Sequence, residues 1–118
     1  MNKRVTGLLA ETHVANYLAQ KGYKILNRNY RTHFGEIDII AKHADVLVFI
    51  EVKYRSVIKY GYPEDAVNKR KLKTIQKVAE QYIVSQNKNQ NLPEKYRLEI
   101  VSIVRINERF ETKIIKVI

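Results

Sequence analysis

Hydrophobic positions along the chain follow two different spacings, which predict a mixed α/β protein. Residues 3–21 and about 68–86 carry apolar residues every three or four positions, as amphipathic helices do. Residues 23–30, 36–41, 46–53, 96–104 and 110–117 alternate apolar and polar positions, as half-buried strands do. The predicted order is therefore αβββαββ, with a mixed sheet flanked by helices in a single domain over residues 1–118.

The first predicted helix has an apolar stripe on one face. Its members are Val5, Leu8, Leu9, Thr12, Ala15, Leu18 and Ala19. Glu11 lies on the flank of this stripe. It is either a rim residue that reaches solvent or a carboxylate that points towards the central strands.

A turn at Ala44–Asp45 joins the second and third predicted strands and sets their register. One face of this hairpin then pairs only apolar residues: Ile37 with Val52, Ile39 with Ile50, and Ala41 with Val48. Such a face must lie against a helix. A slip of one residue would turn the apolar set to the other side, so the pattern favours this register.

The opposite face of the hairpin brings two carboxylates together. Asp38 faces Glu51, and Glu36 faces Lys53. Like charges placed directly across two strands repel, with Cβ atoms about 4.5–5.5 Å apart. A shared proton, a nearby cation or a divalent metal would relieve the repulsion, and Mg²⁺ accepts such oxygen ligands. The alternative is that these are solvated strand-end charges, with Lys53 balancing Glu36.

The charge is distributed unevenly along the 118 residues, whose net charge is +10. Residues 1–33 carry six bases and one acid, 34–68 carry four bases and six acids, and 69–118 carry twelve bases and five acids. An acidic centre between basic flanks favours a phosphate-rich partner, most simply nucleic acid. The chain has no cysteine and no long apolar run. These absences predict a cytoplasmic protein without disulfides, thiolate metal sites or a membrane segment.

Candidate phosphate contacts lie on both sides of the acidic centre: Arg31, Arg55, Asn68, Lys69, Arg70 and Lys71. The last four begin the second predicted helix, whose N-terminus also attracts phosphate. The alternative is that these bases form an ordinary solvated face. The three histidines have no metal-ligand spacing, and His43 is expected to be exposed in its turn.

Asp38, twelve intervening residues and then Glu51-Val52-Lys53 resemble the PD-(D/E)xK motif of restriction-endonuclease-like nucleases. More narrowly, the chain resembles the YraN family, also called uncharacterised protein family 0102. The matching stretches are Gly7 with Glu11, Tyr17-Leu18, residues 22–29, 35–40, 47–55 and 63–67. Ala10 stands where the family usually has glycine, and Arg97-Leu98-Glu99 where it usually has Arg-Phe-Asp.

The resemblance implies a restriction-endonuclease-like fold with a metal-dependent phosphodiesterase site. On that analogy Asp38 and Glu51 hold Mg²⁺ or Mn²⁺, and Val52 adds its carbonyl oxygen. Lys53 would orient the attacking water and stabilise charge on the phosphate. Glu11 matches the helix acid of archaeal Holliday-junction resolvases, which implies a third metal ligand.

The first functional hypothesis is a Mg²⁺- or Mn²⁺-dependent endonuclease acting on DNA, including branched or single-stranded forms. The alternatives are a non-catalytic nucleic-acid-binding protein with the same fold, and a protein that binds an acidic partner. A homodimer would supply two active sites for a duplex. The terminal strands offer apolar residues that are either edge surface or core: Ile103, Ile114, Val117 and Ile118. The pattern assigns no role to Glu36, Gln76 or Glu99.

Overall fold

A computed structural model of the protein describes residues 3–55, 69–86 and 93–117. The elements are α1 (Lys3–Gln20), β1 (Lys24–Thr32), β2 (Gly35–His43), β3 (Val46–Arg55), α2 (Lys69–Gln86), β4 (Lys95–Ile106) and β5 (Arg109–Lys116). This order confirms the αβββαββ prediction. Neither helix is long and apolar enough to cross a membrane, as far as the described part of the chain goes.

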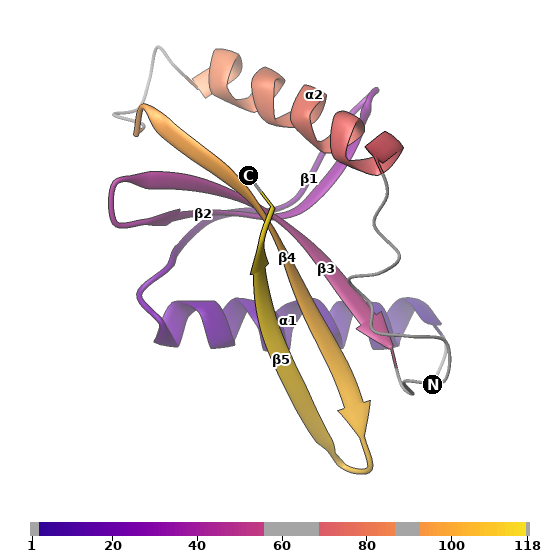
Figure 1. The fold of residues 1–118 in the computed structure, drawn as a ribbon. Coiled ribbons are helices and arrows are strands. Elements are labelled where there is room, and N and C mark those ends of the chain that lie inside the picture. Colours follow the sequence, from indigo (N-terminus) through magenta and orange to yellow (C-terminus); the bar gives the residue numbers. More distant parts are fainter. Residues whose placement is uncertain (1–2, 56–68, 87–92, 118) are drawn as a thin grey trace.

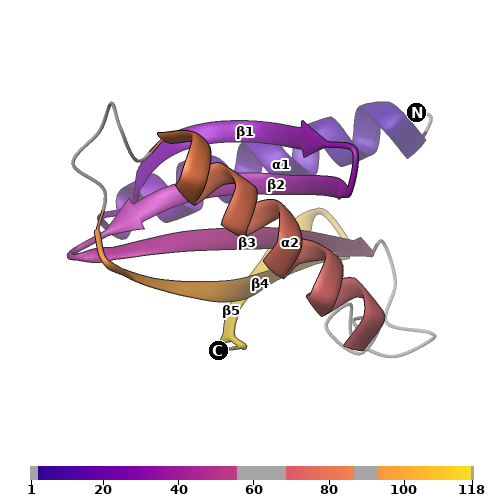
Figure 2. The same cartoon turned by 90° about the horizontal axis from the view of Figure 1, so that it is seen from above.

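All five strands belong to one mixed sheet, in the order β1-β2-β3-β4-β5 (Figure 1). The β3–β4 pair is parallel and the other three pairs are antiparallel. Parallel neighbours need a long crossover connection, and α2 lies within it. The two helices cover opposite faces of the sheet, as the view from above shows (Figure 2).

Each helix buries its own face against the sheet. The α1 side holds Ile39, Ala41, Val48 and Ile50 of the central hairpin. The α2 side holds Ile40 and Phe49 of the same strands, together with four buried residues of α2: Ile75, Val78, Ala79 and Tyr82. The pairs Ile39–Ile50 and Ala41–Val48 lie in the predicted register.

The predicted stripe on α1 is confirmed at Ala15 and Leu18, which are buried, and wrong at Leu8 and Leu9, which are 49% and 52% exposed. Thr12 and Ala19 are exposed as well, while Ala10 and Val14 are buried in their place. Ala10, Val14 and Leu18 are four apart, so they form a helical stripe as regular as the predicted one. The small Ala10 begins it, and the two large leucines drew the prediction to the neighbouring face. This rotation leaves Glu11, next to Ala10, half-buried beside the sheet.

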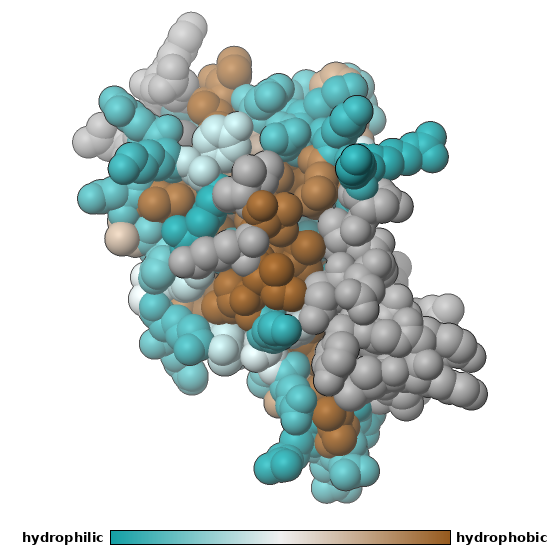
Figure 3. Space-filling view, viewed as in Figure 1, coloured by the Kyte–Doolittle hydropathy of each residue, from teal (hydrophilic) through white to brown (hydrophobic). Residues whose placement is uncertain are grey.

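The terminal strands contribute core rather than exposed edge. Ile103 is fully buried on the α1 side, Ile114 packs against that cluster, and Val117 packs against the cluster under α2. Ile118 lies outside the described residues. Apolar side chains gather at the centre of the face seen in Figure 1, with hydrophilic side chains around them (Figure 3). The homodimer stays a prediction.

Two leucines of α1 test which face of the helix is buried. We expect Leu18→Ala to lower the free energy of unfolding by about 2–5 kcal/mol, because it opens a cavity in a packed core. Leu9→Ala, the matched control, should change it by less than about 1 kcal/mol. Urea unfolding followed by circular dichroism measures both. Equal losses in the two variants would contradict the observed orientation of α1.

Candidate active site

The candidate site lies where β2 and β3 part. The paired residues of β2 and β3 run from the turn as far as Ile39–Ile50. Among the described residues, these two strands form no pair beyond that point. The next residue of β2, Asp38, accepts a hydrogen bond at 2.8 Å from the backbone N–H of Val52 to its Oδ2. A carboxylate therefore takes the place of a backbone acceptor, and the Asp38 side chain reaches the strand that carries Glu51.

The parting of the strands corrects the predicted pairing. Ile37 and Ile39 would share a face in a regular strand, but Ile37 packs under α2 while Ile39 packs under α1. The predicted contact between Ile37 and Val52 on a single apolar face is therefore wrong. The neighbouring strand is also irregular here, since Asn29 has a left-handed φ of 54°. Alternation breaks at Asp38 because its side chain, rather than the backbone, bonds to β3.

Glu51 is a buried carboxylate held between two lysines. Its side chain is 8% exposed, and its Oε1 lies 3.5 Å from Lys53 Nζ and 3.6 Å from Lys71 Nζ. Lys53 follows on β3, whereas Lys71 comes from the first turns of α2. A carboxylate this buried is costly unless it is paired, so the two ammonium groups offset its desolvation.

Asp38 carries a strongly perturbed pKa. Burial, followed by the negative charge of Glu51, raises the pKa of its carboxyl to about 7. The hydrogen bond from Val52 opposes the shift, while the charges of Glu11 and Glu36 add to it. Desolvation and like charge together thus disfavour the ionised form. Repulsion between Asp38 and Glu51, expected from the sequence, is a feature of the folded protein.

Two further carboxylates border this pair. Burial raises the pKa of Glu11, Arg28 lowers it, and the charges of Glu36 and Glu51 raise it again. With its amide oriented to satisfy both partners, Asn29 donates hydrogen bonds to Glu11 and Glu36, each at 3.1 Å. The positive φ of Asn29 is unusual for a residue within a strand, and it accompanies this double contact. Asn29 therefore links Glu11 of α1 to Glu36 of β2.

The predicted pair of Glu36 and Lys53 is wrong. Glu36 forms its ion pair with Arg31 at 2.7 Å, while Lys53 lies by Glu51. Arg31 was expected to contact phosphate. Its side chain is 75% exposed, so its ion pair with Glu36 lies at the surface. Replacing Glu36 by a phosphate as the partner of Arg31 would therefore cost little free energy.

The remaining predicted phosphate contacts divide into two groups. Lys69 and Arg70 are exposed at the start of α2, where an anion could approach them. Lys71 is half-buried and turns towards Glu51, so it belongs to the site itself. Asn68 and the side chain of Arg55 lie outside the described residues.

The donor set fits Mg²⁺ or Mn²⁺ through two carboxylates. In residues 3–55, 69–86 and 93–117, no three Asp, Glu, His or Cys side chains already form a metal-ligand group. Mg²⁺ needs only one or two carboxylates, since water and phosphate complete its shell. The pKa of Asp38 is raised by burial and by the charge of Glu51, and a cation bound beside the two carboxylates would oppose this shift. The place of Glu11 as a third ligand stays a prediction.

A second buried polar cluster was missed from the sequence. Glu99 is 1% exposed and accepts hydrogen bonds from Tyr23 Oη at 2.9 Å and Arg97 Nε at 2.7 Å. Arg97 also contacts His43 Nδ1 at 3.0 Å, and His43 stacks on Tyr23. His43 is thus half-buried, not exposed as expected. Through Tyr23, Arg97 and His43, this cluster joins the α1–β1 connection, the end of β2 and β4.

The arrangement defines a class of protein. A mixed five-stranded sheet in αβββαββ order, with Asp38 and the Glu51-Val52-Lys53 segment on adjacent central strands, is the restriction-endonuclease-like α/β fold. Residues 10–103 match the model of a family described as "Uncharacterised protein family UPF0102". The chain belongs to this family, which is the YraN family that the sequence resembles.

Similar proteins carry the same family name. A "UPF0102 protein" of Lachnoclostridium phytofermentans is 43% identical over 98% of this chain and 93% of its own length. A "UPF0102 protein" of Clostridioides difficile is 45% identical over 92% of this chain and 93% of its own. The family likeness thus spans nearly the whole chain, and these names record no activity.

The raised pKa of Asp38 predicts a pH-dependent stability in metal-free buffer. Between about pH 4 and 7 the folded state binds a proton that the unfolded state has lost, so stability falls as pH rises. We expect Asp38→Asn, which keeps the acceptor for Val52, to be more stable than the wild type by about 1–3 kcal/mol at pH 8.

Chemical denaturation in EDTA across pH 4–8 measures this difference. The gap between variant and wild type should narrow towards pH 4, where Asp38 is protonated in the folded state and begins to regain its proton in the unfolded state. Asp45→Asn, in the exposed β2–β3 turn, serves as the control and should show no such gap. A constant difference at every pH would contradict the described environment of Asp38.

Proposed function

We propose that the protein is a divalent-metal-dependent endonuclease that hydrolyses phosphodiester bonds in DNA. The observation that carries this proposal is the meeting of Asp38 and Glu51 at the parting of β2 and β3, with Lys53 beside Glu51. A protein that only needed a stable sheet would gain nothing from the buried Glu51 and the half-buried Asp38, which carry like charge. The same three residue types form the nuclease motif that the sequence resembles.

The residues of the chain have distinct roles in this proposal. Asp38 and Glu51, with the carbonyl oxygen of Val52, would hold the metal ion. When bound, such an ion lowers the pKa of a water molecule and offsets charge on the phosphate. Lys53 and Lys71 bring two ammonium groups to the same carboxylate, next to where a phosphodiester would lie. Lys53 would orient the attacking water, and both lysines would stabilise negative charge on the phosphate.

The charge of the surrounding surface supports a nucleic acid as substrate. The chain has a net charge of +10, and the start of α2 presents the exposed Lys69 and Arg70 next to Lys71. Basic side chains position a phosphate backbone without reading its sequence. This surface would bring the backbone to the acidic pair, which by itself repels phosphate.

Cleavage assays with a matched pair of variants test the proposal. We expect the wild type to cut DNA with Mg²⁺ or Mn²⁺ and not with EDTA, using linear duplex, single-stranded and four-way-junction substrates. Glu51→Gln should lower the rate by about 100-fold or more, since even outer partners of metal ligands cost 10–100-fold. Glu108→Gln makes the same change at the exposed β4–β5 turn and should cut normally.

Other outcomes would contradict the endonuclease. DNA binding without metal-dependent cleavage of any substrate would favour the non-catalytic nucleic-acid-binding protein. Absence of binding even at low salt would overturn both functions and leave a protein that binds an acidic partner. Electrophoretic mobility shifts at two salt concentrations, run beside the cleavage reactions, separate these outcomes.

A further inference from the structure

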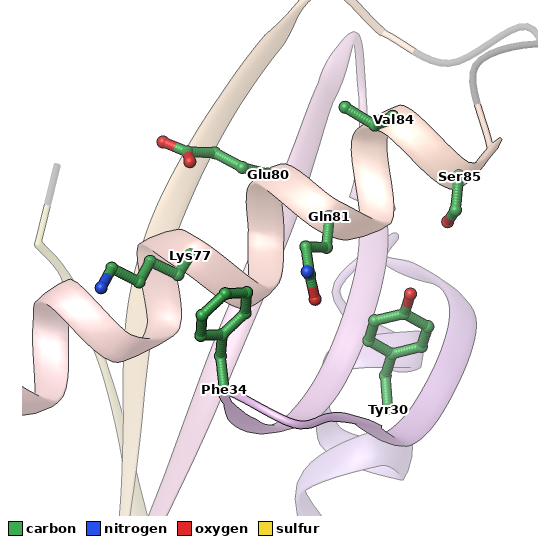
Figure 4. Close-up of a pocket in the computed structure, with 7 residues that line it drawn as sticks. All are labelled: Tyr30, Phe34, Lys77, Glu80, Gln81, Val84 and Ser85. Atoms are coloured by element: carbon green, nitrogen blue, oxygen red, sulfur yellow. The ribbon is translucent and has the colours of Figure 1, made fainter.

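A groove lies between α2 and the β1–β2 hairpin, outside the acidic site. Its volume is about 680 Å³, within the about 300–1,000 Å³ range of small-molecule sites. The hairpin contributes Tyr30 and Phe34, and α2 contributes Lys77, Glu80, Gln81, Val84 and Ser85. Figure 4 shows Phe34 and Tyr30 projecting from the hairpin towards the helix, with the amide of Gln81 between them.

The hairpin reaches α2 closely because of Gly35. A Cβ at this position would lie 2.7 Å from Thr74 Cγ2, and the φ of Gly35 is 152°. Only glycine fits both the backbone conformation and the approach to the helix. The tip that carries Phe34 is therefore fixed against α2 and forms one wall of the groove.

Phe34 presents an aromatic ring that the core does not use. It is 42% exposed, and the Lys77 ammonium lies 5.5 Å from its ring centroid. Tyr30 also lines the groove, half-buried against the core under α2 with its ring edge to face with that of Tyr82. Two aromatic side chains around an open groove suit a flat ring, because stacking on a π face is favourable for any nucleobase.

The polar groups of the groove suit a base better than a phosphate. Gln81 offers both a donor and an acceptor, and Glu80 offers only acceptors. Gln pairs with the edge of adenine, and the Gln81 amide lies between the two rings (Figure 4). The Glu80 carboxylate repels phosphate, so the charge of Lys77 does not make this a phosphate site.

The groove and the active site both involve the β1–β2 hairpin, where Phe34 directly precedes β2 and Asp38 lies within it. Phe34 precedes Asp38 by four residues, which is about 13 Å in an extended strand. At about 3.4 Å per stacked nucleotide this distance spans about four nucleotides, and fewer if the nucleic acid is extended. One strand could therefore pass the acidic pair and place a base in the groove.

We infer that this groove binds an unpaired nucleobase of the strand that crosses the active site. The inference rests on the proposed function and narrows its substrate to nucleic acid with a single-stranded segment near the cut. Bases in a duplex are stacked and paired, so they offer no free face to Phe34. Single strands, flaps and branch points supply such bases.

Binding of short oligonucleotides in EDTA, where no cleavage occurs, tests the base site. The probe is a single-stranded oligonucleotide containing 2-aminopurine, whose fluorescence falls when it stacks on an aromatic ring. We expect Phe34→Ala to bind about five- to tenfold more weakly than the wild type and to lose the quenching. Phe34→Tyr should retain both, and binding of a blunt duplex should not change.

Phe110→Ala is the matched control, because Phe110 is also 42% exposed but packs near His13 and Tyr54, away from the groove. It should bind the probe as the wild type does. Equal binding by Phe34→Ala and wild type, or equal losses in the two Phe→Ala variants, would overturn the base site. Equal losses on single strand and duplex would overturn it as well.

The two proposals fail in distinguishable ways. Metal-dependent cleavage that is insensitive to Phe34→Ala on single-stranded and branched DNA overturns the base site and leaves the endonuclease standing. Binding that depends on Phe34, in a wild type that cleaves nothing, supports the base site and contradicts the endonuclease.

Discussion

Repulsion between two carboxylates is the constraint around which the centre of this protein is built. Asp38 and Glu51 come from adjacent strands of a sheet that is otherwise apolar at its core. Each charge has its own compensation: the Val52 N–H bonds to Asp38, and two lysines lie by Glu51. These compensating groups come from β3 and α2. The N–H group and the ammonium groups that stabilise the two carboxylates are therefore also part of the candidate site.

The parting of β2 and β3 makes this arrangement accessible. Because the pairing stops at Ile39–Ile50, Asp38 can turn its side chain across to Val52 while Ile37 moves under α2. On β1, Asn29 adopts a positive φ and bonds to Glu11 and Glu36. Irregular backbone on β1 and β2 thus occurs where the charges gather.

Sequence periodicity predicted the elements because each strand and α2 has a single clear pattern. The register of the central hairpin followed from its apolar pairs, which tolerate no slip. The rotation of α1 did not follow, because Leu8 and Leu9 compete with the smaller Ala10 and a stripe can be drawn through either set. The large side chains of Leu8 and Leu9 favoured the wrong face of the helix. In the folded protein the face that carries Ala10 packs against the sheet.

The site was predictable only as far as local pattern reaches. Asp38, Glu51 and Lys53 were found from strand pairing and motif spacing. Lys71, placed on the helix surface, reaches Glu51 because of how α2 lies across the sheet, which no local pattern encodes. Asn29 and the Tyr23–Glu99 contact join residues far apart in the chain, 76 positions for the latter, and only the fold brings them together.

The central claim is that Asp38 and Glu51 together hold one divalent ion. Titration of the purified protein with Mn²⁺, followed by electron paramagnetic resonance, counts bound ions directly and without a nucleic acid. We expect one Mn²⁺ per chain in the wild type and a large loss of affinity in both Asp38→Asn and Glu51→Gln. Binding that persists unchanged in either variant, or no binding by the wild type at millimolar Mn²⁺, would contradict the account.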